Sequence, residues 1–566
     1  MRYLGLDFGT VWTKACIYDT DTEMIQLINM DDDTSDHADF ELIGGKYACP
    51  TAVFIGRDEI SKVGKEAVRS RFINPLRFYN MFKPLLSNPD NKNVTVLAES
   101  VIKYVYEKAF HQNECQQFDG VTITVPSSTI ENDTRWERMS EIMDSLRIDH
   151  YSIIKEPEAA GYYILSEALK NNTLNEGEII LVYDFGGGTF DPALIEVKSK
   201  TLRIIGEWDF NKGREIGGVY IDNIIRRDII DSVDLFQEEV IDFFSSIPRD
   251  ESGRPIIDTS NKQFMRDYRN AFTYRDQLSQ LQVAAKHFFS ESESSGYFKE
   301  TPTYSYSLSR EDYYDLISST INETIICCDD LVSRYGGWNI VSKVILVGGS
   351  SLIPLVRERL QEKKDAEDLN YEIYYPNDLG GIDNSILYAV SIGASMFEAL
   401  QPSRDERIAF GKQALLKRDY SEAEYQFSKA QSLYWQAIML YEGLNQKPNF
   451  RKVHDLFYER FSLDLKPQQY TKDDLSLLIL HEYMLFKGEG MKKNDQKLLE
   501  EISPFVTAFT TQPILLDILA LFIKNPMNNM LSNPLIEKLL LLQKAASGEA
   551  CQDDYKVLYD GAFYKL

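Results

Sequence analysis

The chain has 566 residues, of which 43% are hydrophobic and 12% aromatic, and its formal net charge is −26. This composition excludes a disordered chain, and the length exceeds what one hydrophobic core usually serves, so we expect at least two domains. The excess of acids disfavours nucleic acid or an anionic membrane as a partner, because both would be repelled, although solubility alone also explains the charge.

From residue 1 to about residue 400, strand-like runs alternate with amphipathic helical patterns. The strand-like runs include "YLGLDF" from residue 3, "GVTITVP" from residue 120, "EIILVYDFG" from residue 178 and "VSKVILVGG" from residue 341. Helical patterns cover, for example, residues 99–111 and 311–335. This alternation predicts an α/β domain. After the polar break "QPSRDER", which begins at residue 401, residues 403–566 predict helices only.

Cysteine usage and apolar runs suggest a cytoplasmic protein. The six cysteines show no C-x-x-C spacing, which predicts reduced thiols and neither a disulfide framework nor a zinc site. Asp7 stands where a signal peptide would have its apolar core, so we expect no export. The longest apolar run, residues 513–523, contains Asp517 and is too short to cross a bilayer, and it predicts a buried helix.

One strand–turn–strand pattern occurs twice. "LVYDFGGGTFDPALIEV" (residues 181–197) and "YLGLDFGTVWTKACIYD" (residues 3–19) each place an Asp-Phe-Gly turn with a threonine between two strands. Three glycines in a row weaken a hairpin, so their presence indicates that something approaches the backbone closely. Two copies in one α/β region predict two related lobes that face each other.

The chemistry of these turns favours a phosphate and a metal ion. Backbone N–H groups of a glycine turn form an anion-sized concavity, a threonine hydroxyl adds a donor, and an aspartate at the strand end can hold Mg²⁺ through waters. One such hairpin is a weak signal, but two on opposing lobes can clamp a triphosphate. A third turn, Gly-Gly-Ser-Ser in "KVILVGGSSLIPLVRERL" (residues 343–360), leads into a helix N-terminus, which is also suited to an anion. The pattern is neither a Walker A loop nor a Rossmann fingerprint, and a protein kinase is excluded because no His-Arg-Asp loop follows.

In this order the motifs resemble the actin-like ATPase superfamily and, within it, the nucleotide-binding domain of the DnaK-type heat-shock chaperone family, over residues 1–398. "LDFGTVWTK" resembles the first phosphate loop, "VYDFGGGTFD" the second and "ILVGGSSLIP" the adenosine loop. "IKEPEAAGYY" is similar to the connecting helix, "VTITVPSSTIENDTR" to the strand and hinge proline (Pro126), and "EIGGVYID" and "SQLQVAAKHFFS" to the segments over the base. The resemblance implies a two-lobed α/β domain at residues 1–400, with lobe I at 1–175, lobe II at 176–400 and an upper insert at 211–295.

The resemblance also implies roles for individual residues. Asp7, Asp184 and Asp191 would organise Mg²⁺ and its waters, while Lys83, Glu156, Asp184 and Thr189 would form the catalytic set for ATP hydrolysis. The nucleotide, ATP or ADP, would be held by Gly9, Thr10, Val11, Gly186, Gly187, Gly188, Thr189, Gly217, Gly218, Lys286, Ser290, Gly348, Gly349, Ser350 and Asp383. From the residues alone, other interpretations stay open: Glu156 as a helix cap, Asp191 as a strand-end turn residue and Lys83 as a surface lysine.

The base pocket departs from the family pattern. Val283, His287 and Leu352 stand where the family generally has a glutamate and two arginines, and Val11 and Trp12 replace a small residue and a tyrosine. Loss of the arginine pair removes stacking worth roughly 1 kcal/mol per side. We therefore expect weaker nucleotide binding than in a standard chaperone.

The C-terminal region departs further, because neither the leucine-rich linker nor the β-sandwich that binds peptide follows residue 400. Instead "FGKQALLKRDYSEAEYQFSKA" places Gly411, Ala423, Phe427 and Ala430 at tetratricopeptide positions, although the next repeat, near residue 453, is poorly formed. We expect an all-α, tetratricopeptide-like domain at residues 403–566 that binds a partner protein. An ordinary helical bundle is the alternative.

Three functional hypotheses result. The first is a cytoplasmic, DnaK-like protein that hydrolyses ATP slowly, with cleft opening and closing, and binds a partner through its tail. The second is a nucleotide-sensing co-chaperone or scaffold that binds ATP or ADP without useful hydrolysis. The third is a sugar or small-molecule kinase or an actin-like filament protein, which "IKEPEAA" and the long segment 211–290 disfavour.

Overall fold

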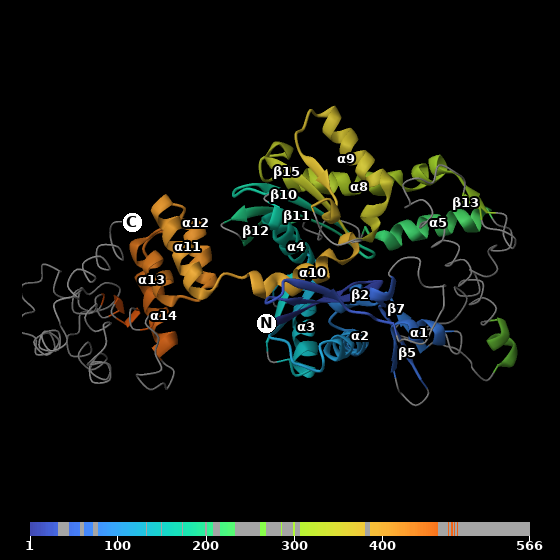
Figure 1. The fold of residues 1–566 in the computed structure, drawn as a ribbon, viewed down its shortest axis with the longest axis horizontal. Coiled ribbons are helices and arrows are strands. Elements are labelled where there is room, and N and C mark those ends of the chain that lie inside the picture. The colour runs from blue at the N-terminus through green and yellow to red at the C-terminus, as the bar shows by residue number, and fades with distance from the viewer. Residues whose placement is uncertain are drawn as a thin grey trace, which may run out of the picture. The chain divides into compact units, whose positions relative to one another are not determined.

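The chain divides into two compact units, Met1–Gln401 and Pro402–Leu566, in the computed structural model of Figure 1. The structure describes residues 1–31, 45–56, 61–71, 77–131, 133–148, 150–171, 174–198, 201–207, 216–232, 261–267, 285, 298–299, 306–379, 385–461, 474, 477–478, 480–481 and 484. Within these residues, no helix combines the length and the apolar character needed to cross a bilayer. The apolar run at residues 513–523 and Cys551 lie outside them.

Two sheets of the same topology form the first unit. The first sheet has the order β3-β2-β1-β8-β9 with β4 beside β2, and the second has the order β12-β11-β10-β15-β16. The strands of the first sheet are β1 (Arg2–Phe8), β2 (Trp12–Asp19), β3 (Met24–Leu27), β4 (Ala48–Pro50), β8 (Gly120–Val125) and β9 (Tyr151–Lys155). Those of the second are β10 (Ile179–Phe185), β11 (Phe190–Lys198), β12 (Thr201–Glu207), β15 (Val341–Val347) and β16 (Glu372–Tyr374).

The repeat that the sequence shows is therefore a repeat of topology. In each sheet three antiparallel strands are followed by two strands that run parallel to the first strand of the hairpin. The hairpins have the same register, because Asp7 lies opposite Lys14 in one and Asp184 lies opposite Asp191 in the other. Each pair spans the turn at the tip of its hairpin.

Helices cover the sheets. The main ones in this unit are α2 (Asn93–Gln112), α3 (Thr134–Ser145), α4 (Glu156–Asn171), α5 (Gly218–Ser232), α8 (Arg310–Ser333), α9 (Pro354–Ala366) and α10 (Ser385–Leu400). The expected helices at 99–111 and 311–335 correspond to α2, which begins earlier at Asn93, and to α8. Strands β8 and β10 are almost wholly buried, as expected for parallel strands covered on both faces. The predicted α/β class is confirmed.

Shorter elements complete the unit. A three-stranded sheet consists of β5 (Ala52–Ile55), β6 (Ser61–Val63) and β7 (Phe78–Asn80), and a two-stranded one of β13 (Phe298–Lys299) and β14 (Ser307–Leu308). The short helices are η2 (Gly45–Tyr47), α1 (Gly64–Ser70), η4 (Lys83–Ser87), η7 (Trp338–Ile340), η8 (Gly349–Leu352) and η9 (Pro376–Leu379). Five cysteines lie within the described residues; all are free, and four of them are buried.

Helices α4 and α10 lie between the two sheets and pack against both (Figure 1). Their approach is so close that a Cβ on Gly393 of α10 would lie 1.7 Å from the carbonyl oxygen of Ala159 in α4. On the β1 side, a Cβ on Gly5 would lie 2.2 Å from the carbonyl oxygen of Ser391. These glycines set the spacing between the helix pair and the first sheet.

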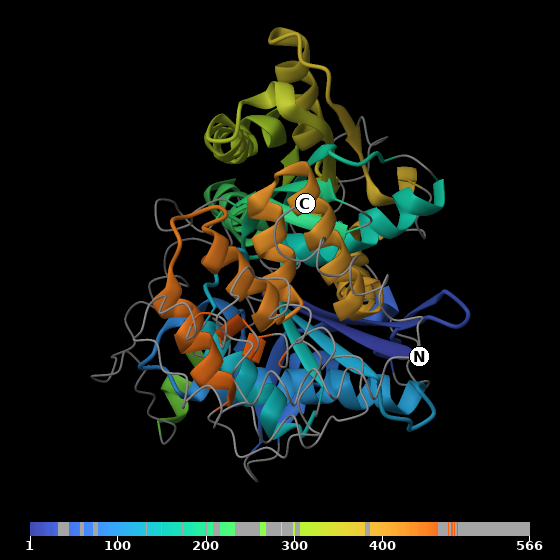
Figure 2. The same cartoon turned by 90° about the vertical axis from the view of Figure 1, so that its left-hand side faces the viewer.

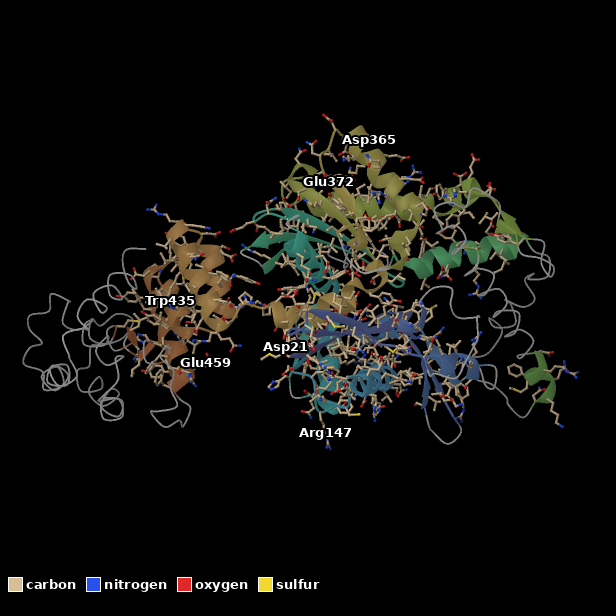
Figure 3. All side chains as sticks on the ribbon, in the orientation of Figure 1. Asp21, Arg147, Asp365, Glu372, Trp435 and Glu459 are labelled. Carbon is tan, nitrogen blue, oxygen red and sulfur yellow. The ribbon has the colours of Figure 1, made fainter. Side chains whose placement is uncertain are left out.

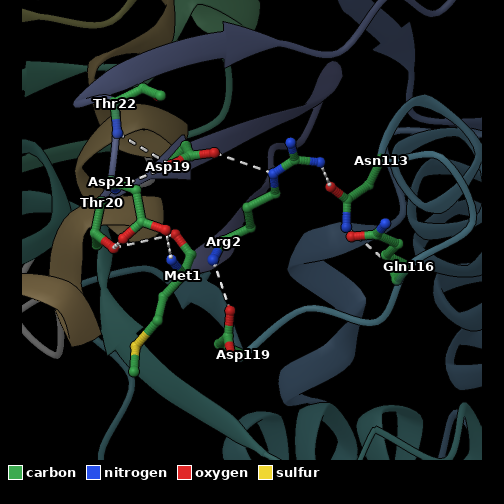
Figure 4. Close-up of polar contacts among 9 residues, drawn as sticks. All are labelled: Met1, Arg2, Asp19, Thr20, Asp21, Thr22, Asn113, Gln116 and Asp119. Carbon is green, nitrogen blue, oxygen red and sulfur yellow. Dashed lines mark hydrogen bonds and ion pairs between the residues drawn. The ribbon is translucent and has the colours of Figure 1, made fainter.

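Polar contacts fix the first residues of the chain. The Arg2 backbone N–H donates to Asp119, and its guanidinium donates to Asp19 and to Asn113 (Figure 4). The hydrogen bond from Arg2 holds the pKa of the Asp19 carboxyl below its ordinary value. Strand β1 therefore begins at a fixed place, visible beside the N-terminus in Figure 2, and its other end carries Asp7.

The second unit is helical over its described residues. Its helices are α11 (Arg404–Lys417), α12 (Tyr420–Lys429), α13 (Leu433–Glu442) and α14 (Phe450–Phe461). Helix α11 begins in the predicted break because the Ser403 hydroxyl accepts from the Glu406 backbone N–H, and the Glu406 carboxylate accepts in return. Phe427 of α12 is fully buried and stacks on Trp435, labelled in Figure 3. A Cβ on Gly411 would lie 2.4 Å from the Phe427 ring, so the small residue admits the aromatic one.

Replacing Gly393 by alanine tests the helix crossing. We expect Gly393→Ala to destabilise the protein by at least about 2 kcal/mol, because the added methyl group meets rigid backbone. The matched control is Gly161→Ala in α4, where the methyl group would meet only the mobile ends of Ile195 and Leu202. Urea unfolding followed by tryptophan fluorescence measures both. Equal stability of the two variants would contradict the tight crossing.

Candidate functional site

The two glycine turns lie against each other. A Cβ on Gly188 would lie 2.1 Å from Oγ1 of Thr10, and a Cβ on Gly187 would lie 2.9 Å from a methyl carbon of Val11. Both turns are partly exposed, whereas the strands that lead into them are buried. The absence of side chains at Gly187 and Gly188 is therefore what lets the tips of the two hairpins meet.

Neighbouring segments hold each turn. Around the first turn, the Thr51 backbone N–H donates to the Val11 carbonyl at 2.8 Å, and the Thr51 hydroxyl donates to the Gly9 carbonyl at 2.8 Å. A Cβ on Gly9 would lie 2.2 Å from the carbonyl oxygen of Trp12, so this turn is tight. These contacts fix the position of Thr10 at the tip.

The second turn is held from two sides. The N–H groups of Gly218 and Val219, at the start of α5, donate to the carbonyls of Gly186 and Gly187 at 3.0 and 2.8 Å. A Cβ on Gly217 would lie 2.3 Å from the backbone of Gly188. Within the turn, the Gly186 N–H donates to the Thr189 carbonyl at 3.0 Å.

The third glycine turn also contacts the second. The Ser350 hydroxyl donates to the Gly186 carbonyl at 3.0 Å. Gly348 has φ +85, and a Cβ there would lie 2.8 Å from Oδ1 of Asp184. Gly349 begins the short helix η8, with room for a Cβ beside Leu387. The three glycine turns that the sequence separates by more than 330 residues thus share one neighbourhood.

Four buried carboxylates lie beside these turns. Asp7 and Asp184 stand near the ends of β1 and β10, Asp191 near the start of β11, and Glu156 at the first residue of α4. They are close enough to affect one another, because the charges of Asp7 and Asp191 raise the pKa of both Glu156 and Asp184. The strand register and the start of α4 thus concentrate negative charge at one place.

Lys83 of η4 supplies a cation to this cluster. Its ammonium group donates to Oε1 of Glu156, and both side chains are buried. Burial raises the pKa of Glu156 from 4.5 to about 7; the charge of Lys83 opposes this rise, and Asp191 and Asp7 add to it. Glu156 therefore changes its charge near neutral pH. It begins α4, but its side chain is engaged with Lys83.

The two aspartates of the second hairpin have different surroundings. Asp191 accepts hydrogen bonds from both the hydroxyl and the backbone N–H of Ser127. The pKa of Asp184 is raised well above its ordinary value, first by burial and then by the charges of Glu156, Asp191 and Asp7, while Lys14 opposes the rise. A further cation beside Asp184 would relieve this repulsion.

The donor set fits a hydrated magnesium ion. Among the residues that the structure describes, no three His, Cys, Asp or Glu side chains converge closely enough to bind a metal by themselves. Mg²⁺ usually keeps several waters and takes one or two carboxylates together with substrate phosphates. Of Asp7, Asp184 and Asp191, one or two could bind such an ion directly, and the others could hold its waters. When bound, the ion would supply positive charge to the phosphate oxygens.

The protein groups account for the remaining chemistry. Backbone N–H groups of the turns, with the hydroxyls of Thr10 and Thr189, can donate to phosphate oxygens. The ionised carboxylate of Glu156 can orient a water molecule and accept its proton, and the Lys83 ammonium offsets negative charge beside it. Such a site suits transfer of a phosphoryl group to water.

Some predicted residues are outside the described part of the chain, and two residues of the site were not predicted. Lys286, Ser290 and Asp383, with Val283 and His287, lie outside the described residues. The sequence analysis missed Ser127 and Lys14, the hydrogen-bond donor to Asp191 and the cation beside Asp7. Lys14 had a readable signal, because it follows Asp7 at the same spacing at which Asp191 follows Asp184.

Removing Lys83 tests the electrostatics of the site. Because the folded state raises the pKa of Glu156, this group favours folding most below pH 4.5, and the benefit is lost as pH rises through about 7. Lys83→Met removes the attraction that limits this loss. We expect the destabilisation by Lys83→Met to be larger at about pH 8.5 than at about pH 6, by roughly 2 kcal/mol, because only the ionised Glu156 needs the cation.

Thermal or urea unfolding at the two pH values measures this difference. The double variant Lys83→Met with Glu156→Gln is the control, since it has no carboxylate to titrate and should lose the extra pH dependence. A Lys83→Met penalty that does not change with pH would contradict the pairing.

Known proteins are similar to part of the chain. Residues 95–373 match the family described as Hsp70 protein. The chain is 23% identical over 393 residues to "Chaperone protein HscA" of Buchnera aphidicola subsp. Acyrthosiphon pisum, covering 64% of this chain and 55% of that protein. It is 24% identical over 382 residues to "Chaperone protein HscA homolog" of Rickettsia prowazekii, covering 63% and 52%.

The chain therefore spans about half the length of these curated relatives. The matched family, the repeated sheet topology and the three glycine turns agree with one another. The resemblance predicted from the sequence motifs is confirmed for this part of the chain. Residues 95–373 therefore match the Hsp70 family, and the match, the relatives and the repeated sheet topology together support the actin-like ATPase fold of an Hsp70-type nucleotide-binding domain.

Proposed function

We propose that the protein binds ATP and Mg²⁺ and hydrolyses ATP slowly, and that its helical unit binds a partner protein. The observation that carries the proposal is the meeting of the two glycine turns beside four buried carboxylates and the Lys83–Glu156 ion pair. The relatives described as chaperones support an ATP-driven role in handling another protein.

In the proposed reaction the turns hold the phosphates from both lobes. Thr10 and Thr189 donate to phosphate oxygens, and Glu156 orients the attacking water and takes its proton. Lys83 keeps Glu156 in place and offsets charge that develops on the γ-phosphate. A carboxylate with a pKa of about 7 is well matched to a general base that works near neutral pH.

Nucleotide-dependent closure would act through the helix crossing. Helices α4 and α10 pack against both sheets, so a change in the distance between the two hairpin tips must turn the lobes about this crossing. At Gly393 the two helices are in close backbone contact, so this crossing is the proposed pivot. The opening and closing of the cleft is therefore part of the proposal.

The helical unit is the proposed partner-binding region. In the pair α11 and α12, the small Gly411 faces the buried Phe427, as expected for a tetratricopeptide-like pair. Ala423 and Ala430 are buried as well. Paired helices of this kind stack into surfaces that bind peptides or proteins.

A second candidate is a nucleotide-sensing scaffold that binds ATP or ADP without useful hydrolysis. Leu352 favours it, because this residue ends η8 in the third glycine turn where the resembled family generally has an arginine over the base. Without that stacking group, nucleotide would be held mainly by its phosphates. Calorimetry with ATP, ADP and GTP beside a phosphate-release assay separates the two candidates.

The variants Glu156→Gln and Thr189→Ala test hydrolysis. We expect Glu156→Gln to lower ATP turnover by about 100-fold or more, because the water loses its general base, while ATP binding changes little. In the unchanged protein, turnover should rise with pH through about 7 as Glu156 loses its proton, and this rise should vanish in Glu156→Gln. Thr189→Ala should also lower turnover without unfolding the protein.

Steady-state phosphate release across pH, with calorimetry of ATP binding, provides these measurements. Lys343→Met is the control. Lys343 lies in β15, four residues before the strand ends, and its ammonium group forms an ion pair with Glu178 at 3.1 Å. This ion pair takes no part in the site. ATP binding without phosphate release in the unchanged protein would favour the scaffold. Turnover unaffected by both site variants would remove the catalytic roles.

A further inference from the structure

Lys14 occupies a position in the site that the proposed reaction does not use. Its ammonium group lies 3.1 Å from Oδ2 of Asp7, and only 18% of the Lys14 side chain and 9% of the Asp7 side chain are exposed. Lys14 also opposes the rise in the pKa of Asp184, so its charge acts on both hairpins. The charge of Lys14 would therefore also affect a ligand that binds beside Asp7 and Asp184.

The repeated topology shows what is unusual about Lys14. Asp7 and Lys14 are directly opposite each other in the first hairpin, and Asp184 and Asp191 hold the same register positions in the second. Lys14 is therefore the counterpart of Asp191. Where one hairpin places two carboxylates beside its glycine turn, the other places a carboxylate and an ammonium group.

This substitution changes the charge that a ligand meets. The four carboxylates carry −4 when ionised, and Lys14 with Lys83 supplies +2, so the cluster has a formal charge of −2 before any metal binds. Lys83 is engaged with Glu156, at a buried contact. Lys14 is the more exposed of the two lysines, and it extends from β2 beside the turn that carries Thr10.

We propose that Lys14 binds the phosphates of the nucleotide and supplies part of the positive charge that Mg²⁺ would otherwise provide, so that nucleotide binding is partly independent of the metal. This inference rests on the proposed nucleotide binding. Without metal, Lys14 would bridge Asp7 and the phosphates; with metal, Asp7 would help to hold the hydrated ion and Lys14 would keep its phosphate contact. A lysine is suited to this exchange because its ammonium is a compact charge on a flexible stem.

The alternative hypothesis, that the Lys14–Asp7 ion pair is purely structural, leads to a different prediction. If Lys14 only neutralises Asp7, its loss affects folding and does not depend on whether Mg²⁺ accompanies the nucleotide. If Lys14 binds phosphate, its loss weakens nucleotide binding most when no Mg²⁺ is present, because Lys14 would then be the cation beside the first hairpin that offsets the phosphate charge.

The experiment measures ATP and ADP binding to the full chain by calorimetry, in excess Mg²⁺ and in EDTA. We expect the unchanged protein to bind ATP in EDTA with a measurable affinity. Lys14→Met should weaken binding in EDTA by about 10- to 100-fold, as for loss of a charge-assisted hydrogen bond, and by only a few-fold in Mg²⁺. Lys14→Arg, which keeps the charge, should retain most of the EDTA binding.

Lys343→Met is the matched control, because it breaks an ion pair of the same 3.1 Å length in the second sheet and should change neither affinity. Thermal unfolding without nucleotide shows whether the Lys14 variants fold. The unchanged protein gives a test that needs no variant: Mg²⁺-dependent ATP binding with none detectable in EDTA would overturn the role of Lys14 and leave the proposed function standing.

Equal losses for Lys14→Met in EDTA and in Mg²⁺ would also overturn it. Failure of the unchanged protein to bind ATP in either buffer would overturn the proposed function and this inference together. A loss confined to EDTA, rescued by Lys14→Arg, would establish Lys14 as a phosphate-binding residue.

Discussion

The site depends on close contact between two hairpin tips that carry almost no side chains. A Cβ on Gly188 would occupy the space of the Thr10 hydroxyl, and one on Gly187 would crowd Val11. Turns this close to each other can present backbone N–H groups to one phosphate chain from two sides. The glycines thus serve the geometry of the site, at a cost to the stability of the hairpin that contains them.

The same contact concentrates charge. Because each strand carries an aspartate one residue before its end, bringing the turns together also brings Asp7 and Asp184 together, with Glu156 and Asp191 beside them. Burial makes the repulsion among these carboxylates strong. Two lysines partly offset it through ion pairs with Asp7 and Glu156, and Ser127 donates hydrogen bonds to Asp191. A cluster that remains short of positive charge is disposed to take up a cation together with an anionic ligand.

Rigid packing connects this chemistry to the rest of the domain. Glu156 is the first residue of α4, and α4 meets α10 in backbone contact at Gly393 between the two sheets. A shift of the first turn of α4, which carries Glu156, would therefore be transmitted to the helix pair that packs against both sheets. This is the physical basis on which a ligand at the turns could alter the relation of the two sheets.

Local sequence determined the glycine turns, the aspartates beside them and the alternation of strands and helices, because each depends on residues within a few positions of one another. The repeated Asp-Phe-Gly pattern even indicated two related lobes, and the sheets share one topology. By contrast, the partners of the buried charges were decided by the tertiary structure. Lys83 meets Glu156 across 73 residues, and Ser127 meets Asp191 across 64, so neither pairing has a local pattern. Lys14 is intermediate: its pairing with Asp7 follows from hairpin register, but its effect on Asp184 arises only when the second hairpin packs against the first.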